Sequence, residues 1–254
     1  MAQDSVGRED GRGRPSADYT GETAGWNVLA EKLSELARSM QEEKGLENTL
    51  AAIVHAAAET VPGAEEASIS AVRARREVRT VAASDELAAA VDTAQYVTGE
   101  GPCLDSLYQH QTERLSDMRD CQRWPQFAAR AAQLGVGSML AVQLYVDGDN
   151  LGALNLHSRR TDAFDDESEQ VALMFAAHAA VAFAGAQAQE QMQTAVNSRD
   201  LIGQAKGILI ERYKISGQEA FRLLVVASQT TNIKLCDIAD YLVSTGELAS
   251  RPHP

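Results

Sequence analysis

The sequence predicts an α+β protein in which an antiparallel sheet with flanking helices is joined by a long helix to an all-α three-helix domain. Two pairs of strand-like segments, within residues 67–82 and 138–157, predict the sheet. An unbroken helical pattern predicts the joining helix, and three shorter helical patterns between residues 197 and 248 predict the last domain. At 254 residues the chain is long enough for about two domains, and its 44% apolar residues can build their cores.

Composition and cysteine usage indicate a cytoplasmic protein. The N-terminus is polar and charged, and no uninterrupted apolar run approaches the ~18 residues that span a bilayer. Cys103, Cys121 and Cys236 form neither a CxxC pair nor a Cys/His cluster, which fits a reducing compartment and argues against a structural zinc site. We therefore expect no membrane partner, no metal and no identifiable cofactor.

Tails and two helices are predicted around the first domain. Residues 1–25 are rich in Gly, Asp, Arg and Ser and poor in apolar residues, which is typical of a disordered tail, and residues 249–254 form a second tail. Apolar residues at helical spacing predict helices over residues 26–40 and 46–57.

Four strands follow. Residues 67–72 alternate like a half-buried strand and can pair with residues 77–82 across a polar turn. Residues 138–146 and 151–157 flank the turn residues Asp147-Gly148-Asp149-Asn150, so they predict a hairpin. Between the two pairs the pattern predicts, in order, a helix ending near Gln109, an extended piece over Leu115–Asp117 and a helix opening at Trp124.

The joining helix is predicted to begin near Asp165, where acidic residues occupy the first turn and interact favourably with the helix dipole. Apolar residues then recur at steps of three and four, the pattern of a two-helix seam. The part up to about Val181 is expected to pack on the sheet. Beyond Ala184 the helix is too polar for a core, and we expect it to pair with its copy in a coiled-coil homodimer. The residues expected at this contact are Val181, Gly185, Met192 and Val196.

The last domain shows clear helix boundaries. The joining helix is expected to run into its first helix and to end at a turn before Ser216. Ser216 and Glu219 have the spacing of a capping box, which predicts a second helix reaching about Thr230. Asn232 stands in the next connection, and Gly246 is expected to end the third helix.

This C-terminal segment resembles the ANTAR domain, an RNA-binding three-helix module of bacterial antitermination regulators. The resemblance covers residues 197–248 without a gap. It implies that the chain binds paired stem-loops in nascent mRNA and prevents transcription termination. The residues that carry the resemblance are Ser198-Arg199, Ile202, Ala205-Lys206-Gly207, Leu209, Ala220-Phe221, Leu224, Ser228, Asn232, Leu235 and Ala239.

Charge does not by itself suggest RNA binding. The net charge is −13, whereas phosphate contacts favour a basic surface. Within residues 197–248 the basic and acidic residues are equal in number, so this segment is neutral. The basic residues are Arg199, Lys206, Arg212, Lys214, Arg222 and Lys234, and the acidic ones are Asp200, Glu211, Glu219, Asp237, Asp240 and Glu247.

The residues predicted to contact RNA are therefore chosen from the resemblance and from their polar chemistry. Lys206 is the first candidate for a phosphate contact, and Gly207 beside it would let a backbone approach closely. Aromatic side chains for base stacking are few, and Phe221 is expected to lie in the core. The full set is Arg199, Lys206, Gly207, Arg212, Ser228, Gln229, Asn232 and Lys234, although a solvated lysine and a capping Asn232 are the simpler interpretations.

The first domain resembles a GAF domain, a small-molecule sensor fold, over about residues 28–186. Such a fold is an antiparallel sheet with helices on its faces, and its ligand pocket lies between the sheet and the loops and helices of one face. A ligand of unknown identity is thus implied. The segments that carry the resemblance are Gly99-x-Gly101-Pro102-Cys103, Asp117, Trp124-Pro125-x-Phe127, Gly135-Val136-x-Ser138 and Leu151-Gly152-Ala153-Leu154-Asn155-Leu156.

A set of aromatic, apolar and polar residues is predicted to line this pocket, although the same residues would serve equally as core. Cys103 can be a reactive thiol or, more simply, a small buried hydrophobe. The histidines show no spacing that suggests a metal or haem site. The pocket candidates are Tyr96, Cys103, Asp117, Trp124, Phe127, Leu140, Val142 and Leu154.

The sequence thus predicts a non-enzymatic regulator, since no P-loop, nucleophile elbow or paired-carboxylate motif is present. Expected partners are RNA and a second copy of the chain, with RNA polymerase or a signalling protein as further candidates. One alternative is a protein-interaction module that does not bind RNA. Another is a DNA-binding regulator, which the acidic Asp237 and Asp240 on the third helix disfavour.

Overall fold

The structure, a computed structural model, describes residues 45–73, 77–108, 112–146 and 149–248. Both predicted tails and the predicted helix over residues 26–40 lie outside these ranges. The chain divides into two compact units, one containing Leu50–Ala180 and the other containing the residues from Val181 onward.

The first unit is built on a five-stranded antiparallel sheet with the strand order β2-β1-β5-β4-β3. Both predicted strand pairs are confirmed, and the extended piece near Leu115 becomes the edge strand β3. The hairpin strand β5 starts at Asp149, inside the predicted turn, and Asn150 pairs with Tyr145. The strands are β1 (Glu66–Arg73), β2 (Glu77–Ala83), β3 (Thr112–Leu115), β4 (Ser138–Val146) and β5 (Asp149–Ser158).

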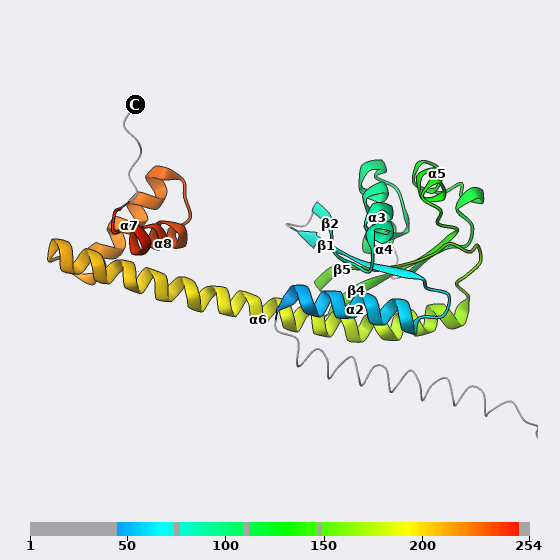
Figure 1. The fold of residues 1–254 in the computed structure, drawn as a ribbon, viewed down its shortest axis with the longest axis horizontal. Coiled ribbons are helices and arrows are strands. Elements are labelled where there is room, and N and C mark those ends of the chain that lie inside the picture. Colours follow the sequence, from blue (N-terminus) through cyan, green and yellow to red (C-terminus); the bar gives the residue numbers. More distant parts are fainter. Residues whose placement is uncertain (1–44, 74–76, 109–111, 147–148, 249–254) are drawn as a thin grey trace, which may run out of the picture. The chain divides into compact units, whose positions relative to one another are not determined.

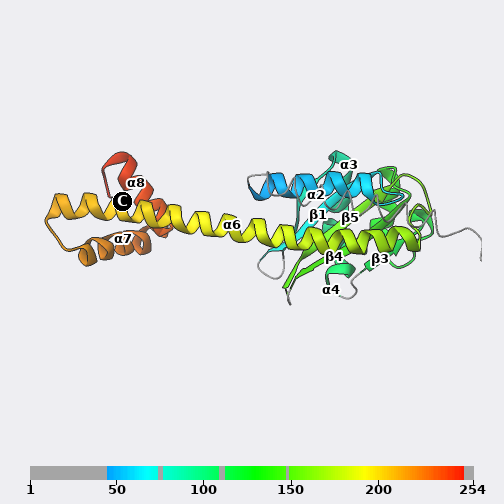
Figure 2. The same ribbon diagram turned by 90° about the horizontal axis from the view of Figure 1, so that it is seen from below.

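Helices cover both faces of this sheet (Figures 1 and 2). Helices α2 and α6 lie on one face, and α3, α4 and α5 lie on the other. Both faces are therefore buried, which explains why β4 is apolar along most of its length. The helices are α2 (Leu46–Thr60), α3 (Glu86–Thr98), α4 (Pro102–Tyr108), α5 (Pro125–Gln133) and α6 (Asp166–Tyr213), and a short 3-10 helix, η1 (Met118–Asp120), precedes α5.

Helix α3 is absent from the sequence prediction, although its local signals are present. The Asp85 carboxylate accepts a hydrogen bond from the Ala88 N–H at 2.9 Å, and Gly99 ends the helix in the left-handed conformation. Between them Leu87, Val91 and Ala94 recur at helical spacing. This helix supplies the polar residues that face the sheet.

Helix α6 confirms the prediction of one helix that runs from the first unit into the C-terminal unit. Among the described residues it is the helix long and apolar enough to cross a membrane by length and composition alone. Its stretch Val171–Gln189 lacks Asp, Glu, Lys and Arg, but His178 and the glutamines interrupt it, so it contains no uninterrupted apolar run of that length. Six residues of its first half are instead buried in the protein: Ala172, Phe175, Ala176, Ala179, Ala180 and Phe183.

The C-terminal unit closes three helices around a small apolar core. Helix α7 (Gly217–Thr231) begins at the predicted capping box, and Gly246 ends α8 (Leu235–Thr245), as predicted. The core residues come from all three helices, including the end of α6. They are Ala205, Leu209, Ala220, Leu224, Ala227, Ile238, Ala239 and Leu242.

Candidate functional sites in the two units

A cluster of polar side chains is buried between the sheet and α3. The Asp92 carboxylate of α3 accepts hydrogen bonds from Thr80 Oγ1 at 2.8 Å and from Asn155 Nδ2 at 2.9 Å. Asn155 Nδ2 also donates to Ser70 Oγ at 2.9 Å, and the Ser70 hydroxyl lies 2.6 Å from that of Tyr96. We call these five residues, Ser70, Thr80, Asp92, Tyr96 and Asn155, the polar cluster.

The polar cluster holds a carboxyl group without a salt bridge to a cationic residue in the described part of the chain. Asp92 is fully buried, and its hydrogen-bond donors are neutral hydroxyl and amide groups. Burial raises the pKa of this carboxyl to about 6, although these hydrogen bonds act in the opposite direction. Asp92 is therefore placed to change its charge close to neutral pH.

The turn before α4 brings Gln95 and Cys103 next to this cluster. Gln95 Oε1 accepts a hydrogen bond from the Cys103 N–H at 2.9 Å. Gly101 permits this contact, because a Cβ there would lie 2.3 Å from Gln95 Oε1 and its φ of +139° disfavours other residues. Gln95 Nε2 and Asn155 Oδ1 are both buried and have no hydrogen-bond partner among the described residues, so within this part of the chain each has unused capacity to bind a polar group.

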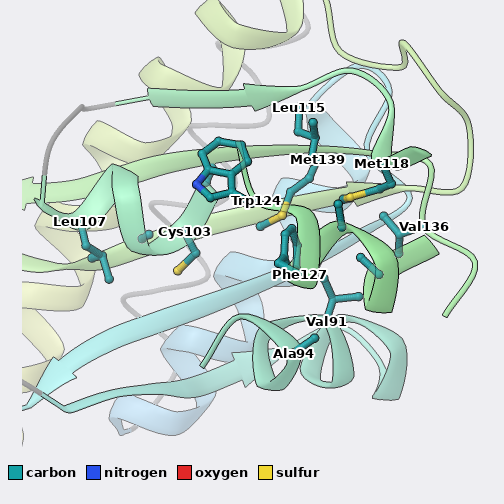
Figure 3. Packing of buried hydrophobic residues seen from close by; sticks show 14 residues of the cluster. Val91, Ala94, Cys103, Leu107, Leu115, Met118, Trp124, Phe127, Val136 and Met139 are labelled. Atoms are coloured by element: carbon teal, nitrogen blue, oxygen red, sulfur yellow. The ribbon is translucent and has the colours of Figure 1, made fainter. Parts of the chain in front are cut away.

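Cys103 behaves as a buried hydrophobe in this setting. It belongs to the apolar cluster around α3, α4 and α5 (Figure 3). Burial, and secondarily the charge of Asp92, raise the pKa of its thiol to about 12. The reactive thiolate is therefore scarce at neutral pH, which favours the simpler of the two interpretations.

His157 lies on the same face of the sheet, further along β5. Its imidazole is fully buried, and neither ring nitrogen has a hydrogen-bond partner in the part of the chain that the structure describes. Burial lowers the pKa of His157 to about 4. This histidine is consequently neutral across the physiological range.

The predicted pocket residues separate into groups in the structure. Tyr96 belongs to the polar cluster, and Cys103, Trp124 and Phe127 pack in the neighbouring apolar cluster (Figure 3). Asp117 lies elsewhere, where it caps the short helix η1 and pairs with Arg119.

Three further pocket candidates lie on the opposite face of the sheet. Met139, Ala141 and Ala153 belong to the cluster beneath α3, α4 and α5, and successive side chains of a strand point to opposite faces. The candidates that alternate with them are buried but face α2 and α6, so the structure does not bring them to the polar cluster. They are Leu140, Val142 and Leu154.

An open depression of about 500 Å³ occurs elsewhere on the first unit, near the start of α6. Acidic side chains dominate its lining, and Arg114 is paired there with Asp166 at 2.9 Å. None of the predicted pocket residues contributes to it, and it is separate from the polar cluster.

In the C-terminal unit the predicted RNA contacts lie at two ends of α7. The Lys206 amine lies 3.9 Å from the position that a Cβ on Gly217 would occupy, at the start of α7. Ser228, Asn232 and Lys234 surround the other end. Ser228 Oγ donates to the Ile233 carbonyl at 2.6 Å. Since α7 has 15 residues, about 22 Å separates its two ends.

Several of these candidates also have structural roles. Asn232 is the left-handed C-cap of α7, with φ of 58°, and Lys234 occupies the N-cap position of α8. Arg212 reaches the end of α8, because its Nη2 atom lies 3.7 Å from the point where a Cβ atom would stand if Gly246 carried a side chain. Arg199, Gly207 and Gln229 are exposed.

Aromatic side chains are more accessible on this unit than the sequence predicts. Phe221 is 41% exposed, so its expected place in the core is wrong. Phe221 lies one helical turn after Gly217 on α7, and its ring faces solvent beside the buried Ala220. Tyr213 and Tyr241 are also exposed. Three aromatic rings are therefore available for stacking on unpaired bases.

The four residues predicted for the dimer are exposed on α6. Val181 is 65% exposed, Met192 73% and Val196 49%, and Gly185 has open space beside it. Three large apolar side chains on this part of α6 are therefore accessible to solvent.

Family models assign both units. A model of the GAF domain matches residues 43–184, more than half of the chain, and a model of the ANTAR domain matches residues 190–243. The chain is a GAF–ANTAR protein. Both domains are regulatory rather than catalytic. The polar cluster therefore belongs to the GAF domain, and of its five members the sequence analysis predicted Tyr96 alone.

Solved GAF structures share the fold of the first unit. The GAF domain of a phosphoenolpyruvate-protein phosphotransferase from Coxiella burnetii is 19% identical, with a TM-score of 0.50, and the match covers 64% of this chain and 96% of that one. Free methionine-R-sulfoxide reductase from Neisseria meningitidis, solved with its substrate, is 16% identical, with a TM-score of 0.51 and coverage of 68% and 95%. No functionally curated protein matches the chain in sequence.

Proposed function

We propose that this GAF–ANTAR protein is a cytoplasmic, signal-responsive RNA-binding regulator without catalytic activity. Its ANTAR domain binds paired stem-loops in nascent mRNA and thereby prevents transcription termination, and its GAF domain controls that binding. The observation that carries the proposal is the ANTAR match over residues 190–243, joined by the unbroken helix α6 to a GAF domain.

The proposed RNA surface comprises two groups of residues on the C-terminal unit. Lys206 of α6, whose amine lies beside the start of α7, contacts phosphate, and the exposed ring of Phe221, one turn into α7, stacks on a loop base. The α7–α8 junction supplies a second contact through polar and basic groups. Besides Phe221, the residues in the proposal are those predicted from the sequence: Arg199, Lys206, Gly207, Arg212, Ser228, Gln229, Asn232 and Lys234.

The chain acts as a homodimer in this proposal, through Val181, Gly185, Met192 and Val196 of α6. Two ANTAR domains in one particle match two stem-loops in one transcript. The second contact is then intramolecular and raises the overall affinity through its effective concentration. RNA polymerase or a signalling protein is a further candidate partner.

Control by the GAF domain requires a ligand that binds one state of the dimer more tightly than another. A differential binding free energy of about 1–3 kcal/mol is sufficient for a useful switch. The polar cluster is the proposed site of action. Its ionisable Asp92 and the unpaired amide groups of Gln95 and Asn155 suit a small ligand with both donor and acceptor groups.

Salt dependence of RNA binding tests the proposal. We expect the logarithm of the affinity for an RNA with two adjacent hairpins to fall linearly with the logarithm of salt concentration. Lys206→Ala should weaken binding and reduce the slope by about one ion. Lys214→Ala is the matched control, because it removes the same charge from an exposed lysine that pairs with Glu211.

The result also separates the rival functions. Affinity no higher than that for an unstructured RNA, at every salt concentration, would contradict RNA recognition. The acidic chain would then be better described as a protein-interaction module, which the net charge of −13 favours. Tighter binding to duplex DNA than to RNA would instead support the DNA-binding alternative.

A further inference from the structure

The hydrogen bonds of the polar cluster are arranged around a charged carboxylate. Asp92 Oδ2 accepts from Thr80 Oγ1 at 2.8 Å, and Asp92 Oδ1 accepts from Asn155 Nδ2 at 2.9 Å. The Ser70 hydroxyl lies 3.5 Å from Oδ2. An ionised carboxylate accepts hydrogen bonds but cannot donate one. These neighbours therefore present donors to Asp92, as its charged form requires.

The Asn155 amide in this network is crowded on one side and unpaired on the other. Its Nδ2 carries two hydrogens but lies near three acceptors, which are Asp92 Oδ1, Ser70 Oγ at 2.9 Å and Ser68 Oγ at 3.4 Å. Its Oδ1 is buried and has no hydrogen-bond partner among the described residues. The amide that donates to Asp92 thus also holds an unused acceptor.

A proton on Asp92 would change the direction of these hydrogen bonds. The protonated carboxyl has one O–H donor, and an unpaired buried donor costs free energy, so one neighbour has to accept a hydrogen bond in place of donating one. Thr80 and Ser70 can do so by rotating a hydroxyl hydrogen, and Asn155 can do so by turning its amide through half a turn. Each change reverses a bond between α3, which carries Asp92, and a strand of the sheet.

Tyr96 connects the buried carboxyl with the surface. Its side chain is partly exposed, and its hydroxyl lies 2.6 Å from Ser70 Oγ and 3.1 Å from Thr80 Oγ1. Thr80 Oγ1 in turn donates to Asp92. Hydroxyl groups both donate and accept hydrogen bonds. The cluster therefore contains a hydrogen-bonded route by which a proton can reach Asp92 while the carboxyl stays buried.

The titratable groups around Asp92 leave its charge uncompensated in the described part of the chain. The groups of β1, β2 and β5 that bond to it are neutral hydroxyls and an amide. Tyr96 on α3 and Cys103 on α4 are both neutral near pH 6, because burial raises the pKa of each. His157 on β5 is neutral there too, since burial lowers its pKa to about 4. In this interior, Asp92 is the described group whose charge changes near neutral pH.

Strand β5 carries Asn155 and lies between α3 and α6. Asn155 is on the face of the sheet that α3 covers. Leu154 and Leu156 beside it point to the opposite face, which α2 and α6 cover (Figures 1 and 2). Both leucines are fully buried, and closely packed interiors transmit small shifts. A shift of α3 against β5 therefore acts on the packing beneath α6, the helix that continues into the ANTAR domain.

We infer that Asp92 is a proton-sensing group: proton uptake there reverses hydrogen bonds between α3 and the sheet and thereby alters RNA binding by the ANTAR domain. The inference rests on the proposed function, because it requires that the GAF domain control RNA binding. It adds the proton as a signal that acts at the polar cluster. Coupling of the usual size between two sites changes an affinity by about 5- to 150-fold.

Titration of Asp92 in the full chain tests proton binding without RNA. The carbon-13 NMR resonance of its carboxyl, identified by its loss in Asp92→Asn, should shift with a midpoint near pH 6. Thr80→Val keeps the shape of the side chain but removes a donor to the carboxylate, so it should raise the midpoint. A resonance that stays constant between pH 5 and pH 8, or an unchanged midpoint in Thr80→Val, would contradict the inference.

The affinity for an RNA with two adjacent hairpins tests the coupling. Between pH 5 and pH 8 at constant salt, we expect the wild-type affinity to change by at least about fivefold, with the midpoint of the Asp92 resonance. Asp92→Asn should remove most of this change, because an amide offers a donor and an acceptor, as a protonated carboxyl does, but does not titrate.

Glu65→Gln is the matched control, because it neutralises an exposed carboxyl of the same domain. The Arg159 N–H donates to Glu65 Oε2 at 3.0 Å and lowers the pKa of that carboxyl, so Glu65 stays charged between pH 5 and pH 8. This variant should keep the full pH dependence of RNA binding.

The remaining outcomes separate this inference from the proposed function. An RNA affinity that changes equally with pH in the wild type and in Asp92→Asn would overturn proton sensing at Asp92, while RNA recognition would stand. A constant RNA affinity despite a shifting Asp92 resonance would overturn the coupling. Affinity no higher than that for an unstructured RNA at every pH would contradict the proposed function itself, and with it the control that the inference requires.

Discussion

The two domains differ in what they bury. The GAF domain encloses charged and polar side chains, among them Asp92, Asn155 and His157, between the sheet and α3. The described ANTAR residues bury an apolar core and no polar side chain of this kind. Polar groups in an interior cost stability unless they are fully hydrogen-bonded. Under the proposed function, the GAF interior holds the groups that respond to a ligand, whereas the ANTAR interior holds a binding surface in place.

The largest expected effect comes from removing a buried apolar side chain from the ANTAR core. Leu224→Ala should lower the free energy of unfolding of the ANTAR domain by about 2–5 kcal/mol, because it removes a fully buried side chain from a small core. Leu223→Ala is the adjacent control, since Leu223 is 38% exposed. Hydrogen exchange of amides in α7 and α8 reports the loss. Equal effects of the two variants would contradict the assigned core.

His157 should make the GAF domain less stable in acid. The unfolded chain takes up a proton near pH 6.5, but the buried imidazole does so only near pH 4. The free energy of unfolding contributed by this group should therefore fall by about 3 kcal/mol as the pH drops from 6.5 to 4. In urea titrations, the stability of His157→Leu relative to the wild type should therefore rise by about 3 kcal/mol as the pH drops from 6.5 to 4. A stability difference between the two chains that does not change with pH would show that His157 has no such effect.

Asp92 should act in the opposite direction over nearly the same pH range. Its folded-state pKa of about 6 lies above the ordinary value of 3.8, so the folded chain binds the proton more tightly. The contribution of Asp92 to the free energy of unfolding is fully present below pH 3.8. It should fall by about 3 kcal/mol as the pH rises to 6. Asp92→Asn removes this loss, and its stability should therefore rise relative to the wild type between these pH values. The same relative stability at pH 4 and pH 7 would argue against a neutral buried carboxyl.

A smaller effect concerns the surface of the ANTAR domain. Ser216 and Glu219 form a complete capping box, in which Glu219 Oε2 accepts from the Ser216 N–H at 2.9 Å and Ser216 Oγ accepts from the Glu219 N–H at 3.2 Å. Ser216→Ala should cost about 1 kcal/mol of domain stability. Ser244→Ala, a change near the end of α8, is the control and should cost less than half as much. Thermal unfolding followed by circular dichroism measures both.

The contrast between the apolar ANTAR core and the polar GAF interior also explains how much of each structure the sequence could predict. The ANTAR domain follows local signals, such as the capping box at Ser216 and the left-handed glycine at Gly246, and its three helices were predicted with their boundaries. In the GAF domain the strands were equally clear. Helix α3 was missed, and with it Asp92, despite the cap at Asp85.

The placement of the pocket residues needed the three-dimensional structure. Strand β4 is buried on both faces, so alternation along it does not reveal which side chains meet α3. Leu140 and Val142 were consequently predicted to line one pocket with Tyr96, although they lie on the opposite face of the sheet from that residue. A usable signal was the polar Asn155 among the apolar residues of β5, because a polar side chain inside a core strand requires a polar partner.

The most direct test of the account compares two RNAs, one with two adjacent hairpins and one with a single hairpin, for binding to the full chain at physiological salt. Two ANTAR domains held in one dimer predict that the two-hairpin RNA binds at least tenfold more tightly, through effective concentration. The advantage should disappear in a variant with Val181, Met192 and Val196 changed to glutamate, which is expected to be monomeric. Equal affinity of the wild-type chain for the two RNAs would contradict paired recognition of stem-loops.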